Sequence, residues 1–270
     1  MMNDNGEFLT LVSTSDKWCG KAASDREAKV NRNILYRKPA IVEEAVLQST
    51  SSDNDTPWTG ILKQHRCDVV DGKYEGGFKL WECSVDLCRF LLHNRDTRTS
   101  VPYRVIEIGC GFGLPGIVSL LHGASFVCFQ DFNEETLHHA TKPNVDANIS
   151  LAGKQQEPSK TTEYIAGDWA DVCTRLKDAG HDHTFNLLLT SETIYNTASY
   201  DKLHDLMDTA LTDEGKILLA AKQCYFGLSG SVPAWLTHVD SRGIFDHKIL
   251  WTSDSSVPRL ILQMARKQAN

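Results

Sequence analysis

The chain has 270 residues, 41% of them hydrophobic and 23% charged, and a formal net charge of −7. This length allows one large domain, or one domain and a tail, with enough apolar residues for a sizeable core. The acidic balance disfavours nucleic-acid binding, which requires a basic surface, and is compatible with a basic protein partner. None of the eight cysteines forms a CxxC pair, so we expect buried thiols in a reducing compartment.

Residues 1–67 are mostly polar, apart from a helical possibility near Ile41–Leu47. Such a composition buries too little apolar surface to offset chain entropy. We therefore expect a flexible N-terminal tail over 1–67 and a folded domain over 68–270. No basic segment followed by an apolar run opens the sequence, which predicts no signal peptide. We expect a cytoplasmic protein, with the nucleus as an open alternative.

From about Asp71 onwards, strand-like and helix-like segments alternate. Helices are predicted at Trp81–Leu92, Pro115–His122, from Glu134 onwards, at Ala170–Lys177 and at Tyr200–Ala210. Strands are predicted at Arg104–Ile108, Ser125–Gln130, Glu163–Ala166, Phe185–Thr190, Gly215–Ala221, Phe245–Trp251 and Arg259–Met264. The alternation favours a parallel, doubly wound sheet with helices on both faces. No helix fits between the last two strands, so we expect them to pair antiparallel. The predicted fold is α/β: a Rossmann-like seven-stranded sheet of five parallel strands and a C-terminal antiparallel hairpin.

A glycine-rich turn follows the first of these strands. Its closely spaced glycines are Gly109, Gly111 and Gly113. They let the backbone approach a ligand, and the helix behind them favours a carboxylate. With Gly116 they also satisfy the dinucleotide pattern GxGxxG, so a nucleotide-dependent oxidoreductase stays an alternative. Glu107 favours S-adenosylmethionine, because its carboxylate suits the ammonium group of that molecule and would repel a pyrophosphate.

The ends of the next two strands carry further candidates for cofactor binding. Asp131 stands where a carboxylate accepts hydrogen bonds from ribose hydroxyls, and Asn133 beside it is a second candidate or a helix N-cap. Asp168 can accept from an adenine amino group, and Trp169 can cover the ring. Trp81 can attract a sulfonium by cation–π interaction. For both tryptophans, core packing is the alternative.

Several motifs together resemble the protein-histidine N-methyltransferase family of the seven-β-strand methyltransferases. They are Lys73–Glu82, Ile108–Gly111, Gln130–Asn133, Gly167–Trp169, Thr190–Asn196, Lys222 and Tyr225–Gly227. The resemblance covers roughly residues 68 to 267. It implies methyl transfer from S-adenosylmethionine, leaving S-adenosylhomocysteine, to one histidine of large-subunit ribosomal protein three, at the ring nitrogen remote from the backbone. It also implies that Ser191 joins the cofactor-binding residues named above.

The predicted catalytic residues are Glu192, Tyr195 and Asn196. A neutral histidine needs no strong base, but it needs the correct tautomer. We expect a carboxylate or main-chain carbonyl near Glu192–Asn196 to accept the other ring proton, and Tyr195 and Asn196 to orient the ring. The alternative for Glu192 is a structural hydrogen bond to the following loop.

Other readings of the sequence stay open. The pair Glu192 and Tyr195 is also similar to the Asp-x-x-Tyr motif of a sister group of protein-lysine methyltransferases. A third possibility is a non-catalytic, cofactor-binding partner of a ribosomal protein. The His181–His183 and His138–His139 pairs have no nearby third ligand, so we expect no metal site. We expect a monomer that binds neither membranes nor nucleic acid directly.

Overall fold

The computed structural model of the chain describes residues 7–12, 33–49, 69, 72–94, 103–152 and 161–268. Its main sheet has seven strands in the order β5-β4-β3-β6-β7-β9-β8. The strands are β3 (Arg104–Ile108), β4 (Phe126–Asp131), β5 (Thr162–Ala166), β6 (Phe185–Ser191), β7 (Leu211–Lys222), β8 (Phe245–Thr252) and β9 (Arg259–Arg266). The first five pair in parallel, and β9 pairs antiparallel with both β7 and β8. This topology confirms the predicted fold class.

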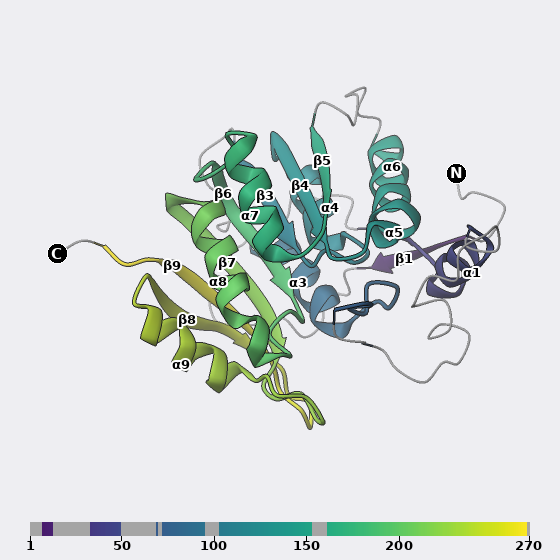
Figure 1. The fold of residues 1–270 in the computed structure, drawn as a ribbon. Helices are drawn as coiled ribbons and strands as arrows, with labels where there is room; N and C mark the ends of the chain where they lie inside the picture. The colour runs from purple at the N-terminus through teal and green to yellow at the C-terminus, as the bar shows by residue number, and fades with distance from the viewer. Residues whose placement is uncertain are drawn as a thin grey trace.

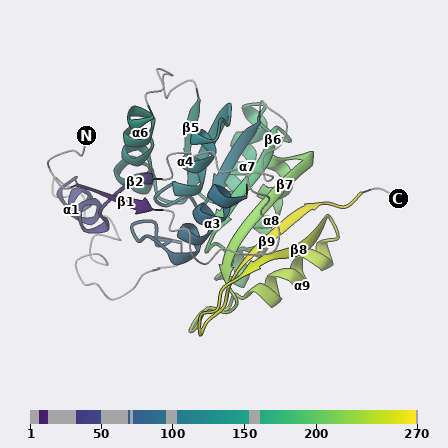
Figure 2. The same cartoon turned by 180° about the vertical axis from the view of Figure 1, so that it is seen from behind.

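Helices cover both faces of the sheet (Figures 1 and 2). One face carries α3 (Glu82–His93), α4 (Leu114–Leu121) and α6 (Lys142–Leu151), and the other carries α7 (Trp169–Asp178), α8 (Tyr200–Ala210) and α9 (Val232–Arg242). The short helix α5 (Glu134–Thr136) and a π-helical turn over Leu137–Thr141 lead into α6. Side chains of β3 alternate between the two faces: Val105 packs in the first hydrophobic cluster, whereas Ile106 and Ile108 pack in the second. None of the helices in the described ranges is long and apolar enough to cross a bilayer.

Helix α9 was not predicted, although the sequence contains signals for it. Ser231 caps its first turn by accepting a hydrogen bond from the backbone N–H of Ala234 at 3.2 Å. Gly243 ends it in the left-handed conformation, with φ of 71°. Val232, Trp235 and Val239 are buried on one face. The polar residues between them hide this period.

Part of the N-terminal region is packed against the domain, which corrects the expectation of a flexible tail. Strands β1 (Phe8–Val12) and β2 (Asn33–Arg37) pair antiparallel, and α1 (Pro39–Ser49) confirms the helix expected near Ile41–Leu47. Ile34, Val42 and Val46 are buried in the same cluster as α3 and α4. The few apolar residues of this region are spaced so that they pack into one hydrophobic core. Their burial stabilises this part of the chain although its overall composition is polar. The remainder of 1–67 lies outside the described residues, and the boundary at residue 68 stays a prediction.

Two asparagines of α6 attach β2 to the domain. Asn148 accepts from the backbone N–H of Leu35 at 3.0 Å and donates to its carbonyl at 2.8 Å. Asn144 accepts from the N–H of Arg37 at 2.7 Å and donates to the carbonyl of Phe112 at 3.0 Å. Asn144 thereby connects β2 to the loop between β3 and α4.

Candidate active site

A cavity of about 340 Å³ opens at the carboxyl ends of β3, β4, β5 and β6. The strand order reverses here, because the chain passes from β3 to β4 and β5 on one side and to β6 and β7 on the other. In doubly wound sheets a crevice forms at this point, since consecutive crossovers leave in opposite directions. The volume lies in the usual range for a small-molecule site, roughly 300–1,000 Å³.

The glycine turn after β3 forms the floor of the cavity. Gly109 has φ of 62° and Gly111 has φ of 50°. A Cβ at Gly109 would come within 2.7 Å of the Cγ2 of Thr193, so the turn requires glycine there. The N–H of Gly111 donates to the Asp131 carboxylate at 2.8 Å.

Three of the predicted cofactor residues do not line the cavity. Glu107 is buried on the α4 side, where its carboxylate accepts from the backbone N–H of Gly116 at 2.8 Å. Burial raises the pKa of this carboxyl well above its ordinary value, although the hydrogen bond from Gly116 opposes the rise. Its expected contact with an ammonium group is therefore not supported. Gly113 packs against Thr141 and the ring of Phe129.

Asn133 is the third residue outside the lining, and it holds the 72–77 loop that faces the cavity. Its amide donates to the carbonyl of Lys73 at 3.0 Å and accepts from the N–H of Glu75 at 3.3 Å. It occupies the N-cap position of α5 without a side-chain capping bond. Asn133 therefore holds the loop in place, and its expected contact with the cofactor stays a prediction.

Asp131 lies in the lining and is almost fully buried. Desolvation raises the pKa of its carboxyl to about 6, although hydrogen bonds from the N–H groups of Gly111, Asn133 and Phe132 oppose the shift. At neutral pH it is therefore an ionised acceptor at the end of β4, as a pair of sugar hydroxyls requires.

Asp168 and Trp169 line one end of the cavity. The carboxylate of Asp168 caps α7 by accepting from Ala170 N–H at 2.9 Å, and it pairs with Lys202 at 2.8 Å. Desolvation raises the pKa of Asp168, but these two partners lower it by more, so the net shift is downward. The indole N–H of Trp169 donates to the side chain of Gln130 at 3.1 Å, which fixes the plane of the ring.

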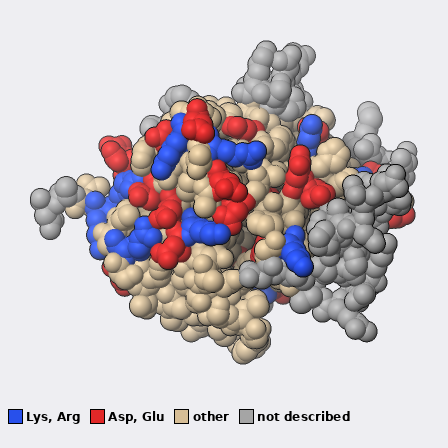
Figure 3. Space-filling model, in the orientation of Figure 1, with Lys and Arg blue, Asp and Glu red and all other residues tan. Residues whose placement is uncertain are grey.

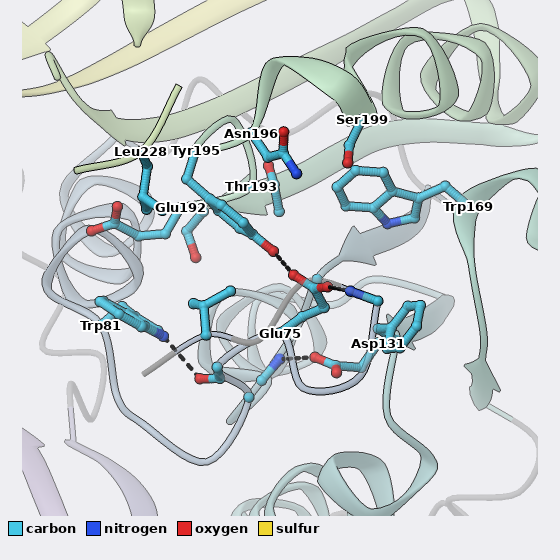
Figure 4. Close-up of a pocket in the computed structure, with 18 of the residues that line it drawn as sticks. Glu75, Trp81, Asp131, Trp169, Glu192, Thr193, Tyr195, Asn196, Ser199 and Leu228 are labelled. Atoms are coloured by element: carbon cyan, nitrogen blue, oxygen red, sulfur yellow. Dashed lines mark hydrogen bonds between the residues drawn. The ribbon is translucent and has the colours of Figure 1, made fainter. Parts of the chain in front are cut away.

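Trp81 lies at the opposite end in Figure 4, with Tyr195 reaching between the two tryptophans. The indole N–H of Trp81 donates to the carbonyl of Gly76 at 2.9 Å. The hydroxyl of Tyr195 donates to the carboxylate of Glu75, whose other oxygen accepts from Gly72 N–H at 2.7 Å. The 72–77 loop and the segment after β6 thus close over the cavity together.

Glu192 lies at the Trp81 end of the cavity, with an unusual backbone conformation and a buried side chain. Its backbone has φ of 59°, and its side chain is 6% exposed. Neither carboxylate oxygen has a close, well-aligned hydrogen-bond partner among the described residues. The Cys83 thiol and the Tyr225 hydroxyl nevertheless interact with this carboxylate, which contributes to their raised pKa values. The alternative of a structural role for Glu192 therefore stays open. The ammonium group of Lys222 lies 3.6 Å away. Glu192 is therefore a charge-paired hydrogen-bond acceptor at the cavity wall.

Lys222 also pairs with Glu82 at 3.1 Å. Burial lowers the pKa of Lys222, but Glu192 and Glu82 raise it by more, so the ammonium group stays charged. Burial, followed by the charge of Glu192, raises the pKa of the nearby Tyr225 hydroxyl well above its ordinary value. Tyr225 is therefore neutral at this wall.

The structure brings together most of the residues that the sequence nominated. Seven of the ten cofactor candidates line the cavity: Trp81, Gly109, Gly111, Asp131, Asp168, Trp169 and Ser191. The three catalytic candidates line it as well. The amide oxygen of Asn196 accepts from Ala198 N–H at 3.0 Å, capping the 3-10 turn Thr197–Ser199, so its expected role in orienting a ring stays a prediction.

Sequence reasoning missed other lining residues, among them Glu75, Thr193, Lys202, Tyr225 and Leu228. Glu75 and Tyr225 stand inside motifs that carried the resemblance, so position within those motifs was the available signal. No sequence signal pointed to Lys202, because its position in the lining depends on how α8 packs beside α7.

The charges of the cavity test which cofactor fits. Four acids line it, namely Glu75, Asp131, Asp168 and Glu192, against the single lysine Lys202. This negative lining favours a ligand with sulfonium and ammonium groups and opposes a pyrophosphate. S-adenosylmethionine therefore fits this lining, and the expected places of Asp131 at the sugar and Trp169 at the base stay predictions. Within the described ranges, no group of three or more His, Cys, Asp or Glu side chains could hold a metal ion.

Comparison with known proteins agrees with this geometry. A family model described as lysine methyltransferase matches residues 68–227. The rat protein "Histidine protein methyltransferase 1 homolog" is 34% identical over 248 residues, covering 84% of this chain and 67% of its own length. The protein with the same description from Dictyostelium discoideum is 44% identical over 167 residues, covering 62% of this chain and 50% of its own. This chain thus spans only half to two thirds of these relatives.

Among solved structures, a putative S-adenosylmethionine-dependent methyltransferase from Listeria monocytogenes aligns with a TM-score of 0.45 at 14% identity. The alignment covers 64% of this chain and 96% of that one. A likeness of this size adds nothing to the family match.

Proposed function

We propose that this chain, which belongs to the S-adenosylmethionine-dependent protein methyltransferase family of histidine protein methyltransferase 1, transfers the methyl group to a histidine side chain. The acceptor atom is the ring nitrogen remote from the backbone. One observation carries the choice of histidine: the buried carboxylate of Glu192 lies in the wall of the cavity, where it can accept the N–H of a substrate ring.

The chemistry follows from what this carboxylate can do. S-adenosylmethionine supplies an electrophilic methyl group on a positively charged sulfur. Glu192 accepts the N–H of the proximal ring nitrogen and so exposes the lone pair of the remote one. Holding the ring in line is worth about 7–11 kcal/mol of the barrier. Methylation of the remote nitrogen makes the ring cationic, and Glu192 then takes the proton of the proximal nitrogen, which leaves a neutral methylhistidine.

Lys222 supports histidine over lysine as the acceptor. Its ammonium group lies 3.6 Å from Glu192 and its side chain passes 5.4 Å from the ring centre of Trp81. Because Lys222 already pairs with Glu192, the ammonium group of a substrate lysine would compete with it for this carboxylate, whereas a neutral imidazole needs only to donate its ring N–H. The description of the family model favours the alternative, a lysine acceptor.

The substrate we propose is large-subunit ribosomal protein three, on the strength of the sequence resemblance. A basic partner is compatible with the net charge of −7. We propose the cytoplasm as the place of action, with the nucleus as the alternative, and a monomer as the active form.

The test uses the full chain with labelled S-adenosylmethionine and large-subunit ribosomal proteins, followed by mass spectrometry of the labelled residue. We expect label on one histidine of protein three, at the remote nitrogen. Label on a lysine would refute the histidine proposal. Binding of S-adenosylhomocysteine without any label would support a non-catalytic partner.

A further inference from the structure

A second cavity, of about 640 Å³, lies against the first. The two share four lining residues, Val69, Trp81, Tyr225 and Leu228. Because the walls are common, the two cavities form one continuous depression in the surface.

The ion pair of the active site spans the boundary between the two cavities. Glu192 lines the first cavity, Lys222 lines the second, and they lie 3.6 Å apart. In Figure 4 Glu192 and Leu228 both lie toward the Trp81 end, away from Trp169. A chain with its acceptor residue at Glu192 would therefore continue into the second cavity.

Two apolar side chains stand exposed on the rim of this second cavity. Phe226 is 82% exposed and Leu228 is 49% exposed. Exposed apolar side chains that adjoin a cavity mark interaction sites, because water contact with them is unfavourable. The 223–230 loop that carries them lies directly beside the active site.

This loop is held firmly, so the exposure of Phe226 is built into the fold. The N–H of Gly230 donates to the carbonyl of Tyr195 at 2.8 Å. A Cβ at Gly230 would lie 2.0 Å from the carbonyl oxygen of Ile194. Ser229 accepts from the N–H of Thr197 at 3.0 Å. A preorganised rim binds a partner without a large ordering cost.

The charges of the second cavity are already paired. Lys222 pairs with Glu82, and Arg259 pairs with the buried Asp86. Ser255 and Ser256 add neutral polar groups to the lining. In Figure 3 the lower end of the molecule shows no Lys, Arg, Asp or Glu on the visible side. The loop between β8 and β9 carries the exposed Asp254, which does not line the cavity. This surface suits an uncharged, apolar occupant.

We infer that the second cavity binds the segment of the substrate protein that flanks the acceptor residue, and that it selects apolar side chains next to that residue. This inference rests on the proposed function, since the acceptor must enter the first cavity.

The test compares two fluorescently labelled peptides, Gly-Ser-Leu-His-Leu-Ser-Gly and the same peptide with serine in place of both leucines. Binding to the full chain, saturated with S-adenosylhomocysteine, is measured by anisotropy. We expect the leucine peptide to bind at least about tenfold more tightly, since burial of even one leucine side chain predicts a difference of this size. Phe226→Ser should weaken its binding about fivefold and leave the serine peptide unchanged.

Ile249→Ser is the matched control, because Ile249 is 54% exposed on β8 and lines neither cavity. Equal binding of the two peptides, binding of neither, or no effect of Phe226→Ser would overturn the inference. Binding needs no methyl transfer, so the two proposals fail separately. Leucine preference without histidine methylation would refute only the proposed function.

Discussion

At the scale of single residues, the backbone of Glu192 is the most unusual feature of the site. A φ of 59° costs a residue with a side chain about 1–2 kcal/mol. The conformation is held because Glu192 N–H donates to the carbonyl of Ala220 at 2.9 Å. It places the carboxylate between Lys222 and the cavity. Strain of this kind gathers where function requires a fixed direction.

Glu192→Gln keeps the size of the side chain and removes its charge. We expect kcat to fall about a hundredfold, because the amide is a weaker acceptor for a ring that becomes cationic. The dissociation constant of S-adenosylhomocysteine should stay within about threefold, measured by calorimetry. Full turnover with intact cofactor binding would rule out the role of Glu192.

Asp131 gives the cofactor site its own pH dependence. Its pKa of about 6 lies above its ordinary value, so it loses its charge as the pH falls through about 6. We expect S-adenosylhomocysteine to bind about tenfold more weakly to Asp131→Asn at pH 7.5, since a hydrogen bond to a charged group is worth about 1.5–3 kcal/mol. In the wild type, calorimetry at pH 5.5 should show weaker binding than at 7.5. Equal affinities at both pH values would contradict this assignment.

At the scale of elements, the contact between β2 and α6 decides whether the N-terminal strands belong to the domain. We expect Asn148→Ala to lower the free energy of unfolding by about 2 kcal/mol, because it removes two bonds to Leu35 and leaves buried backbone groups unpaired. Urea denaturation measures this loss. The backbone N–H of Leu35 should also exchange faster with solvent. Ser150→Ala, at an exposed position of the same helix, is the control.

A buried histidine at the contact of α8 with α9 makes stability depend on pH. His204 is fully buried beside Trp235, and neither ring nitrogen has a hydrogen-bond partner among the described residues. Desolvation, then the charges of Arg242 and His238, lower its pKa from 6.5 to about 4. Between these values the unfolded chain binds a proton that the folded chain does not. The free energy of unfolding should therefore decrease as the pH is lowered from about 6.5 to about 4, by at most about 1.4 kcal/mol per pH unit.

His204→Phe should reduce this slope, measured as the free energy of unfolding in urea at pH 7 and pH 5. His138→Gln changes an exposed histidine and should leave the slope as it is. An unchanged slope in His204→Phe would show that other groups cause the acid sensitivity.

At the scale of the whole molecule, turns that follow four parallel strands line the cavity, so a cofactor bound there should stabilise the entire sheet. With S-adenosylhomocysteine at a hundred times its dissociation constant, we expect about 2.7 kcal/mol of added stability. Thermal unfolding with and without the ligand measures it. NADH at the same concentration should give no shift; a shift with NADH alone would favour the oxidoreductase reading.

The sequence was sufficient to predict the fold class and most of the cavity, because both depend on local patterns. Alternating apolar runs identified the strands, and Gly109, Gly111 and Asp131 stand at fixed places after strands. Two expectations were not met, both at contacts between distant segments. Glu107 turned toward Gly116 because the N-terminus of α4 offers it a hydrogen bond, and no spacing rule shows that direction. The strands β1 and β2 are separated by residues 13–32, so no short turn motif in the sequence predicts that they pair.

The strand order has a further consequence. The turns after β3, β4 and β5 line the cavity predicted to hold the cofactor, whereas the 223–230 loop and the loop between β8 and β9 line the cavity proposed for the segment that flanks the acceptor. The two tasks thus belong to opposite halves of one sheet and meet only at β6. Grafting the 223–230 loop and the loop between β8 and β9 onto another protein of this topology should transfer the choice of substrate and leave the methyl donor unchanged.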